Sequence, residues 1–419
     1  MAPELAAAQI LKSRDIFRPA RGLKPRLLGW VLRRMPLLLR LARRFRPLPR
    51  FAGQRFVTRY DDVVETFRND RDFGVPYADN LAVIMGGEPF FLAMGDTPQY
   101  RADTAAMRRV VRADDVAARL APAAEAMAET VVAGDGGRLE VVDQLIRRVT
   151  FDLLGDYFGV PEPPCGDLRV WATRLFEFQF AEIGRDEELR AQVAAIAPAL
   201  RAHIDAEIVR RRASHCDKDD VLGRCLAMQS AGEPGFDDVR IRTALMGFIV
   251  GGPPQPPMVV PQALEQLLRR PAALAGAQAA ARDGDDALLA GFVFEAMRFD
   301  PLAPSLPRVV LRDATIAAGT RRARRVAAGD RIAVAMSSAM MDERRVPEPR
   351  RFDPRRPADA YLHFGHGLHT CFGILINQAV LPLMLKPLLK RPNLRRAPGR
   401  AGHLRKQGPF AVELHVVHD

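Results

Sequence analysis

The sequence predicts a mainly helical protein with a small β region, and three patterns carry this prediction. Between about residues 115 and 232, Ala, Leu, Val and Ile recur every three or four positions, which is the spacing of helices with one apolar face. Proline and glycine clusters at 134–137 and 161–164 interrupt this pattern and separate successive helices. Only short runs, such as 55–57 and 412–417, are typical of strands.

The bulk composition indicates a globular enzyme-sized protein in a reducing compartment. The chain has 419 residues, of which 48% are hydrophobic and 27% charged. Its four cysteines are too few for a disulfide framework, so we expect a cytoplasmic location. We find no signal peptide and no apolar run approaching the roughly 20 residues that span a bilayer. The length suits two or three domains, but no linker is visible, and we expect residues 52–419 to form one domain.

The formal net charge of +12 indicates that acidic partners are favoured. Nucleic acid is not predicted, because the arginines are scattered and no binding motif is present. An acidic electron-carrier protein fits better, since complementary charge speeds encounter without a large interface. The alternative is that the arginines only reflect a GC-rich genome.

The N-terminal segment 1–51 alternates between basic and apolar residues. We expect an opening helix packed on the fold, and the alternative is an amphipathic helix in peripheral contact with an anionic membrane. From residue 55 a short strand is followed by a helix that begins at Asp61 and Asp62.

The most informative stretch is 363–373, in which a lone cysteine, Cys371, follows several glycines and precedes an apolar, helix-like run. Glycines allow a tight turn and close approach to a flat ligand, and a helix entrance stabilises a thiolate. Such a cysteine can hold a metal through sulfur. The stretch resembles the haem-binding signature of the cytochrome P-450 superfamily, carried here by Phe364, Gly365, Gly367, His369, Cys371 and Gly373.

This resemblance implies that Cys371 is the axial thiolate of a haem b, a ligand that favours cleavage of an O–O bond. His369 would face a haem propionate. Two other interpretations of the same residues stay open. Cys371 is an ordinary buried thiol in the first, and in the second His363, His366, His369 and Cys371 form a zinc site.

A long irregular run, 73–100, resembles the family segment that roofs the substrate pocket. The helix that follows departs from the family pattern of a His or Trp with an Arg four residues later. Tyr100 is followed by Thr104 and then by Arg108 on the same helix face. We therefore predict that Tyr100 and Arg108 contact the cofactor, with Arg101 as the competitor for the propionate.

The stretch 239–268 resembles the long family helix that crosses the haem and carries an acid and a threonine for proton relay. Here the corresponding residues are Gly251 and Gly252, followed by Pro253, Pro254 and Gln255, so a proline replaces the acid and Gln255 replaces the alcohol. Prolines remove helical N–H donors, so we expect a kink or an opening at this point. An amide does not titrate near neutral pH and is a poor general acid.

Glu295 and Arg298 lie three residues apart on a predicted helix. Glu295 precedes Cys371 by 76 residues. They resemble the family's Glu-x-x-Arg helix, and the resemblance implies that Arg351 completes a structural triad with them. Arg308 falls where the family places a strand arginine on a propionate.

The resemblance covers about residues 52–419 and implies the cytochrome P-450 fold and a haem-thiolate oxidoreductase acting on an apolar or biosynthetic small molecule. Monooxygenation with ferredoxin and its reductase is the expected route, since no flavin or nicotinamide motif is present. The missing relay leaves three alternatives: a peroxide- or hydroperoxide-dependent enzyme of the peroxygenase, isomerase or dehydratase type, a substrate whose own hydroxyl relays the protons, and a haem-bearing pathway partner without catalysis.

Overall fold

The computed structural model describes residues 3–17, 23–182, 186–214 and 217–419, with side chains described from 7 and, after the first gap, from 34 onward. The described residues fall into two compact units. Those within 1–19, 77–124 and 147–257 form unit 1, and those within 20–76, 125–146 and 258–419 form unit 2. Each unit is therefore assembled from three separate stretches of the chain.

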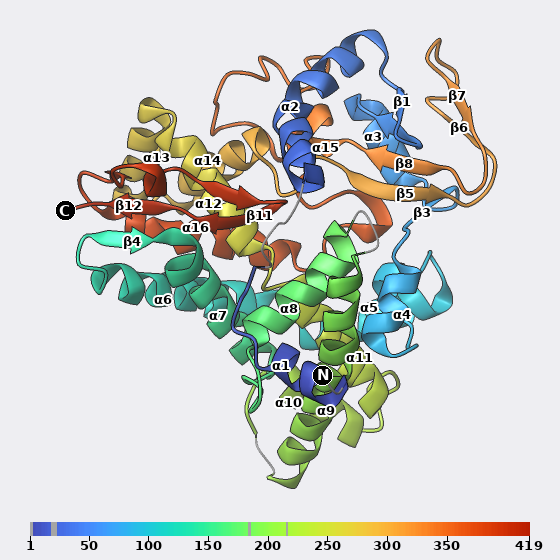
Figure 1. Cartoon of the computed structure of the whole chain (residues 1–419), viewed down its shortest axis with the longest axis vertical. Coiled ribbons are helices and arrows are strands. Elements are labelled where there is room, and N and C mark those ends of the chain that lie inside the picture. Colours follow the sequence, from blue (N-terminus) through green and yellow to red (C-terminus); the bar gives the residue numbers. More distant parts are fainter. Residues whose placement is uncertain (1–2, 18–22, 183–185, 215–216) are drawn as a thin grey trace. The chain divides into compact units, whose positions relative to one another are not determined.

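Unit 1 is helical in its described residues, as the three- and four-residue spacing predicts (Figure 1). Four of its helices begin at aspartates: the carboxylates of Asp167, Asp186, Asp220 and Asp237 accept backbone N–H groups of the first turn. The helices are α1 (Pro3–Leu11), α4 (Ala78–Met85), α5 (Pro98–Val110), α7 (Arg148–Phe158), α8 (Leu168–Phe176), α9 (Glu187–Ala213), α10 (Val221–Ser230) and α11 (Asp238–Gly251).

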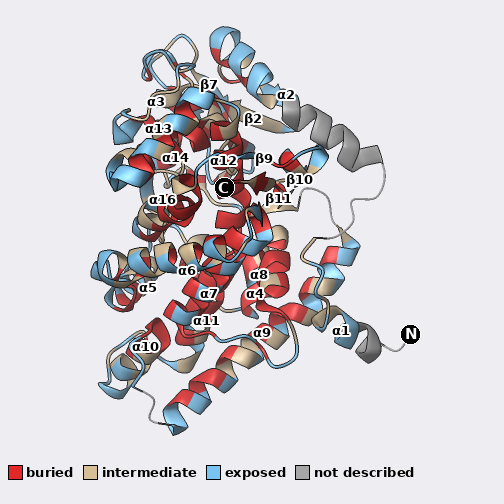
Figure 2. Ribbon diagram, turned by 90° about the vertical axis from the view of Figure 1, so that its left-hand side faces the viewer, coloured by how far each residue is buried: buried red, intermediate tan, exposed pale blue. Residues whose placement is uncertain are grey.

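Helix α11 lies in the core of unit 1 and packs against α7, α8 and α9. Most of its apolar residues are buried, and Phe248 lies near the rings of Phe158 and Phe91, with ring centroids 5.3 and 6.5 Å away. Figure 2 shows the corresponding buried segments in red. A helix surrounded in this way holds its side chains in fixed positions, which suits a helix that lines a site.

Unit 2 contains all the strands that the structure describes. A five-stranded sheet has the order β1-β2-β8-β5-β3, with β2 and β8 parallel and the other pairs antiparallel. Three smaller sheets pair β12 with β4 and β9, β6 with β7, and β10 with β11. The strands are β1 (Arg50–Phe51), β2 (Gln54–Val57), β3 (Phe73–Gly74), β4 (Arg138–Glu140), β5 (Leu306–Val310), β6 (Ala314–Ile316), β7 (Arg324–Val326), β8 (Arg331–Val334), β9 (Arg395–Arg396), β10 (Arg405–Gln407), β11 (Phe410–Glu413) and β12 (His415–Val417).

In unit 2, α13 and α14 pack against α16, which is buried along most of its length, and α2 and α3 pack against α15. Helix α6 (Ala121–Ala133) begins in unit 1 and continues into unit 2, and α12 crosses the boundary near its first turn. The remaining helices are α2 (Leu23–Phe45), α3 (Tyr60–Arg68), α12 (Pro256–Leu268), α13 (Pro271–Asp283), α14 (Asp286–Phe299), α15 (Met336–Ala339) and α16 (Ile374–Lys390).

Two sequence-based expectations about elements need correction. The stretch 412–417 is two strands, because the buried Leu414 separates β11, which pairs with β10, from β12, which pairs with β4 and β9. The segment 1–51 contains two helices in place of one. The carbonyl of Leu11, at the end of α1, accepts a hydrogen bond from Trp171 Nε1, whereas Arg43 of α2 is buried and donates to Ser338.

Within the segment 1–51, the apolar and basic side chains at 27–33 lie outside the described residues. The alternative of membrane contact is therefore not tested at those positions. Farther along α2, Leu37, Leu38, Leu41 and Phe45 are exposed. Among the helices that the structure describes, we find none with the length and apolar character that a bilayer crossing requires.

Candidate active site

The loop before Cys371 makes the tight turn that its glycines predict. Gly365 and Gly367 have φ angles of +73° and +76°, a conformation that other residues rarely adopt. A Cβ atom on Gly367 would lie 2.3 Å from the carbonyl oxygen of Phe67, so glycine is required there by space as well. The turn closes where Cys371 N donates to the carbonyl of Phe364 at 2.9 Å.

Cys371 lies three residues before the first residue of α16, so its sulfur is placed at a helix entrance. The positive end of the helix dipole stabilises an anionic sulfur at such a position. Asn377, in the first turn of α16, donates from Nδ2 to Cys371 Sγ at 3.9 Å. Both features favour a thiolate over a thiol, which is the form that binds metals.

His369 and Arg308 come together in unit 2, as their predicted role on a common anionic group requires. Burial and the nearby Arg308 guanidinium lower the pKa of His369 to about 4. Arg308 is 4% exposed on β5 and lies over the ring of Phe67, 4.8 Å from its centroid. A buried cation beside a neutral imidazole is a favourable place for a carboxylate.

The zinc interpretation is wrong for the described residues, among which no cluster of three or more His, Cys, Asp or Glu could hold a metal ion. His363 Nε2 pairs with the carbonyl of Phe294 at 2.9 Å, and its ring stacks on Tyr361. His366 Nε2 accepts from Arg68 Nε at 2.8 Å. His363, His366 and His369 therefore have different neighbours: the Phe294 carbonyl, Arg68 and Arg308, respectively.

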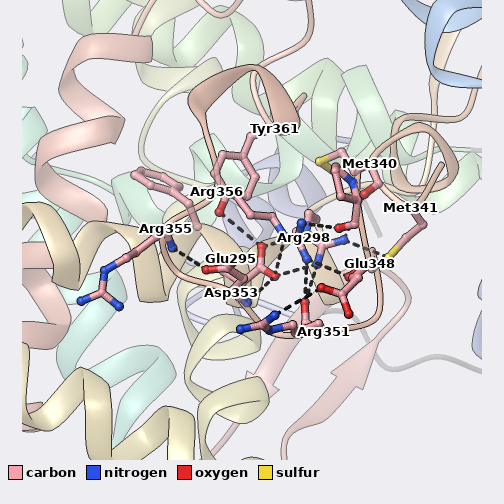
Figure 3. Close-up of polar contacts among 12 residues, drawn as sticks. Glu295, Arg298, Met340, Met341, Glu348, Arg351, Asp353, Arg355, Arg356 and Tyr361 are labelled. Atoms are coloured by element: carbon pink, nitrogen blue, oxygen red, sulfur yellow. Dashed lines mark hydrogen bonds and ion pairs between the residues drawn. The ribbon is translucent and has the colours of Figure 1, made fainter. Parts of the chain in front are cut away.

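Glu295 and Arg298 form a buried ion pair on α14, with both side chains 0% exposed (Figure 3). Arg298 donates from Nη2 and Nε to the two Glu295 oxygens at 2.6 and 2.8 Å. Tyr361 O–H and the backbone N–H of Asp353 also donate to this carboxylate. Because every oxygen of Glu295 is hydrogen-bonded, the pair is stable where an isolated buried charge would not be.

The third member of this network is Arg356, and the prediction of Arg351 is wrong. Arg356 Nε lies 3.2 Å from Glu295 Oε1, and its Nη atoms donate to the carbonyls of Pro347, Glu348 and Arg351 (Figure 3). The Arg351 side chain is 67% exposed and pairs with Glu348, so this residue contributes only its carbonyl. The chain turns between the two arginines and brings the later one inward.

Tyr100, Arg101 and Arg108 all lie on α5 in unit 1. Arg101 makes a bidentate ion pair with Asp96, with Nε 2.6 Å from Oδ1, and its side chain is 69% exposed. The Thr104 hydroxyl donates to the Tyr100 carbonyl and fixes that turn of the helix. A role of Tyr100, Arg101 or Arg108 at the cofactor stays a prediction.

The expected opening in the long helix is present: α11 ends at Gly251 and α12 begins at Pro256. The side-chain amide of Gln255 donates to the carbonyl of Gly251, one of the carbonyls that the end of a helix leaves without a partner. A Cβ on Gly252 would lie 2.8 Å from the carbonyl of Phe248, so the chain needs glycine to turn here. Gln255 thus acts as a cap on the broken helix.

Sequence reasoning missed Asn377 and Arg356. Asn377 follows Cys371 by six residues, and the helical pattern of 374–380 gave no sign of which side chain would turn back to the sulfur. Arg356 lies five residues after Arg351 in an arginine-rich turn, and only packing distinguishes the two.

The fold and the cysteine loop together define a haem-thiolate type of enzyme, and the comparisons with known proteins agree. The family model "Cytochrome P450" matches residues 186–412, more than half of the chain. The chain therefore belongs to the cytochrome P450 family, whose haem-thiolate enzymes are oxidoreductases of the monooxygenase type.

Three relatives illustrate this membership. Cyclomarin C epoxidase CymV of Salinispora arenicola is 28% identical over 298 residues, which cover 71% of this chain and 72% of that protein. A bifunctional dioxygenase–epoxy alcohol synthase of Pyricularia oryzae is 36% identical over 121 residues, but these cover 29% of this chain and only 10% of the fungal protein. The crystal structure of CalO2 has a TM-score of 0.78 at 22% identity, covers 93% of this chain and 97% of its own, and shows the same fold.

Proposed function

We propose that this chain binds haem b through Cys371 and oxidises an apolar or biosynthetic small molecule. The observation that carries the proposal is the position of the Cys371 sulfur at the entrance of α16, with the Asn377 amide 3.9 Å away. His369 and Arg308 would hold a propionate, and the glycine turn allows the macrocycle to approach the backbone. When bound, the haem supplies redox chemistry and oxygen activation, which the thiolate favours.

The other residues of the site have structural tasks in this proposal. Arg298 and Arg356 neutralise Glu295 and tie α14 to the segment that precedes the cysteine loop. Gln255 holds no transferable proton near neutral pH, and its amide is engaged with the Gly251 carbonyl. The chain therefore offers no acid–alcohol relay at 254–255, and protons must arrive through water or through a hydroxyl of the substrate.

The test is the spectrum of the reduced, carbon-monoxide-bound protein. The reconstituted protein should show the thiolate-ligated spectrum, and Cys371→Ala should abolish it. Cys165→Ala is the matched control, since this cysteine is exposed and free. A colourless protein, or a Cys371→Ala variant with an unchanged spectrum, would overturn the proposal.

A second candidate is a peroxide- or hydroperoxide-dependent reaction of the same site. Two observations favour it: the capped break at 252–255, and the match to a protein named for epoxy alcohol synthesis. Product formation with ferredoxin, reductase and NADPH is compared with hydrogen peroxide alone. Turnover only with peroxide would select the second route, and no turnover with either would favour a haem-bearing partner without catalysis. We also propose that ferredoxin donates the electrons and that the protein is located in the cytoplasm.

A further inference from the structure

A cavity of about 200 Å³ lies within unit 1, where the segment before α5 meets α5 and the first half of α11. Its apolar wall is formed by the buried side chains of Phe90, Phe91 and Met107. The ring of Phe90 lies directly on Gly247 of α11, where a Cβ would be 2.2 Å from the ring. This apolar wall is therefore rigid, and the cavity fits a flat, apolar group of about one ring.

One polar group of the cavity wall has no protein partner. Thr243 of α11 is 5% exposed, and its Oγ1 is buried without a hydrogen bond to any described residue. A buried hydroxyl without a partner costs free energy, and threonine in a helix can usually bond to a carbonyl one turn earlier. A ligand that donates a hydrogen bond to Thr243 would remove this cost.

The polar side of the cavity is acidic, in contrast to the net charge of +12 for the whole chain. Among the described residues that line it, the carboxylates of Glu88, Asp103 and Asp237 face one guanidinium, that of Arg240. Arg240 Nε lies 3.5 Å from Asp237 Oδ2, so it is already paired. Burial raises the pKa of Asp103, and neither Arg240 nor the Gln99 amide fully offsets this effect. The site is short of positive charge.

We propose that this cavity binds a small organic cation, an ammonium or guanidinium group on an apolar body of one ring, with Thr243 and Asp103 as its polar contacts. The aromatic side chains of Phe90 and Phe91 line the same cavity, and an aromatic ring attracts a cation placed over it. This goes beyond the proposed oxidation, which requires no cationic ligand and no group at this end of α11. It assigns a binding role to residues that haem chemistry does not use.

The test is calorimetric titration of the full haem-loaded chain with benzylguanidinium and, in parallel, with the neutral isostere benzylurea. A guanidinium stays protonated at any working pH, so the measured heat does not come from coordination of the iron, and the variants below locate the binding site. Benzylguanidinium should bind about tenfold more tightly than benzylurea. Equal affinities, or no binding of either probe, would overturn the proposal.

Variants identify the site. Thr243→Val removes the hydroxyl while keeping the side-chain shape, and Asp103→Asn removes the charge; each should weaken benzylguanidinium about three- to tenfold. Thr130→Val is the matched control, since Thr130 is on α6 and bonds to the Ala126 carbonyl. Glu88→Gln, at the more open side, is an independent variant if Asp103→Asn does not fold. Unchanged affinity in Thr243→Val and in the acid variant would refute the assignment, and because binding needs no turnover, this result would leave the proposed oxidation standing.

Discussion

Asn377 Nδ2 lies 3.9 Å from Cys371 Sγ, and it reaches back from the first turn of α16 to the sulfur that precedes the helix. In the proposed complex, this amide would donate to the axial thiolate and withdraw negative charge from it. Hydrogen bonds to a ligating sulfur are among the means by which a protein sets the potential of its iron.

Asn377→Ala should therefore lower the ferric/ferrous reduction potential, because an uncompensated thiolate disfavours the extra electron. The expected shift is about 20 to 60 mV, the equivalent of one hydrogen bond in a one-electron couple. Spectroelectrochemical titration measures it. The neighbouring exposed Gln378→Ala is the control and should keep the parent potential. A potential that rises or stays the same in Asn377→Ala would contradict this role.

The buried network of Glu295 predicts unequal effects for two arginines. Arg356→Ala should lower the free energy of unfolding by about 3 kcal/mol, because it removes one donor from the buried Glu295 carboxylate and leaves the Pro347 carbonyl without its donor. Arg351→Ala should cost only about 0.5 kcal/mol, since its exposed side chain contacts Glu348 alone and its carbonyl remains. Denaturant unfolding and haem content measure both. Equal losses would show that Arg351 is the true third member.

The helix break predicts a gain of function. Replacing Pro254 by Asp and Gln255 by Thr restores an acid and an alcohol and should raise reductase-driven turnover about tenfold or more if monooxygenation is native. Pro254→Ala with Gln255 retained is the control, because it restores the backbone N–H without the acid. Product per NADPH consumed is the measurement, and an unchanged or lower rate would count against monooxygenation.

His363 predicts a loss of stability in acid. Burial lowers its pKa to about 4 from the ordinary value of 6.5, so at intermediate pH the unfolded chain takes up a proton that the folded chain excludes. The stabilisation is complete above pH 6.5 and is lost as the pH falls toward 4, by about 3 kcal/mol at most. Denaturant midpoints across this window should slope less for His363→Gln, whose amide does not titrate. Parallel slopes in parent and variant would refute the assignment.

The features that the sequence predicts correctly depend on interactions between residues close together in the chain. The turn before Cys371 and the opening at 252–255 follow from glycine and proline, whose backbone restrictions act within a few residues. The helical pattern of unit 1 likewise depends on local spacing. These features were predicted at the correct places.

The choice between similar side chains was not predictable in this way. Arg351 and Arg356 are the same residue type, so the sequence does not distinguish them. The turn between them buries Arg356 and exposes Arg351, and this makes Arg356 the partner of Glu295. Thr243 and Asp103 lie 140 positions apart and meet in one cavity only because α5 packs near α11.

The sequence by itself determined the family, the cysteine at position 371 and the replacement of an acid and an alcohol by Pro254 and Gln255, because each of these features is contained in a short stretch of residues. The tertiary structure alone decided which groups surround them: the Asn377 amide at the sulfur, Arg356 at Glu295, and the acidic cavity beside Thr243. The physical reason is that hydrogen bonds and desolvation depend on distances between side chains, and packing sets those distances across segments that are remote in the chain.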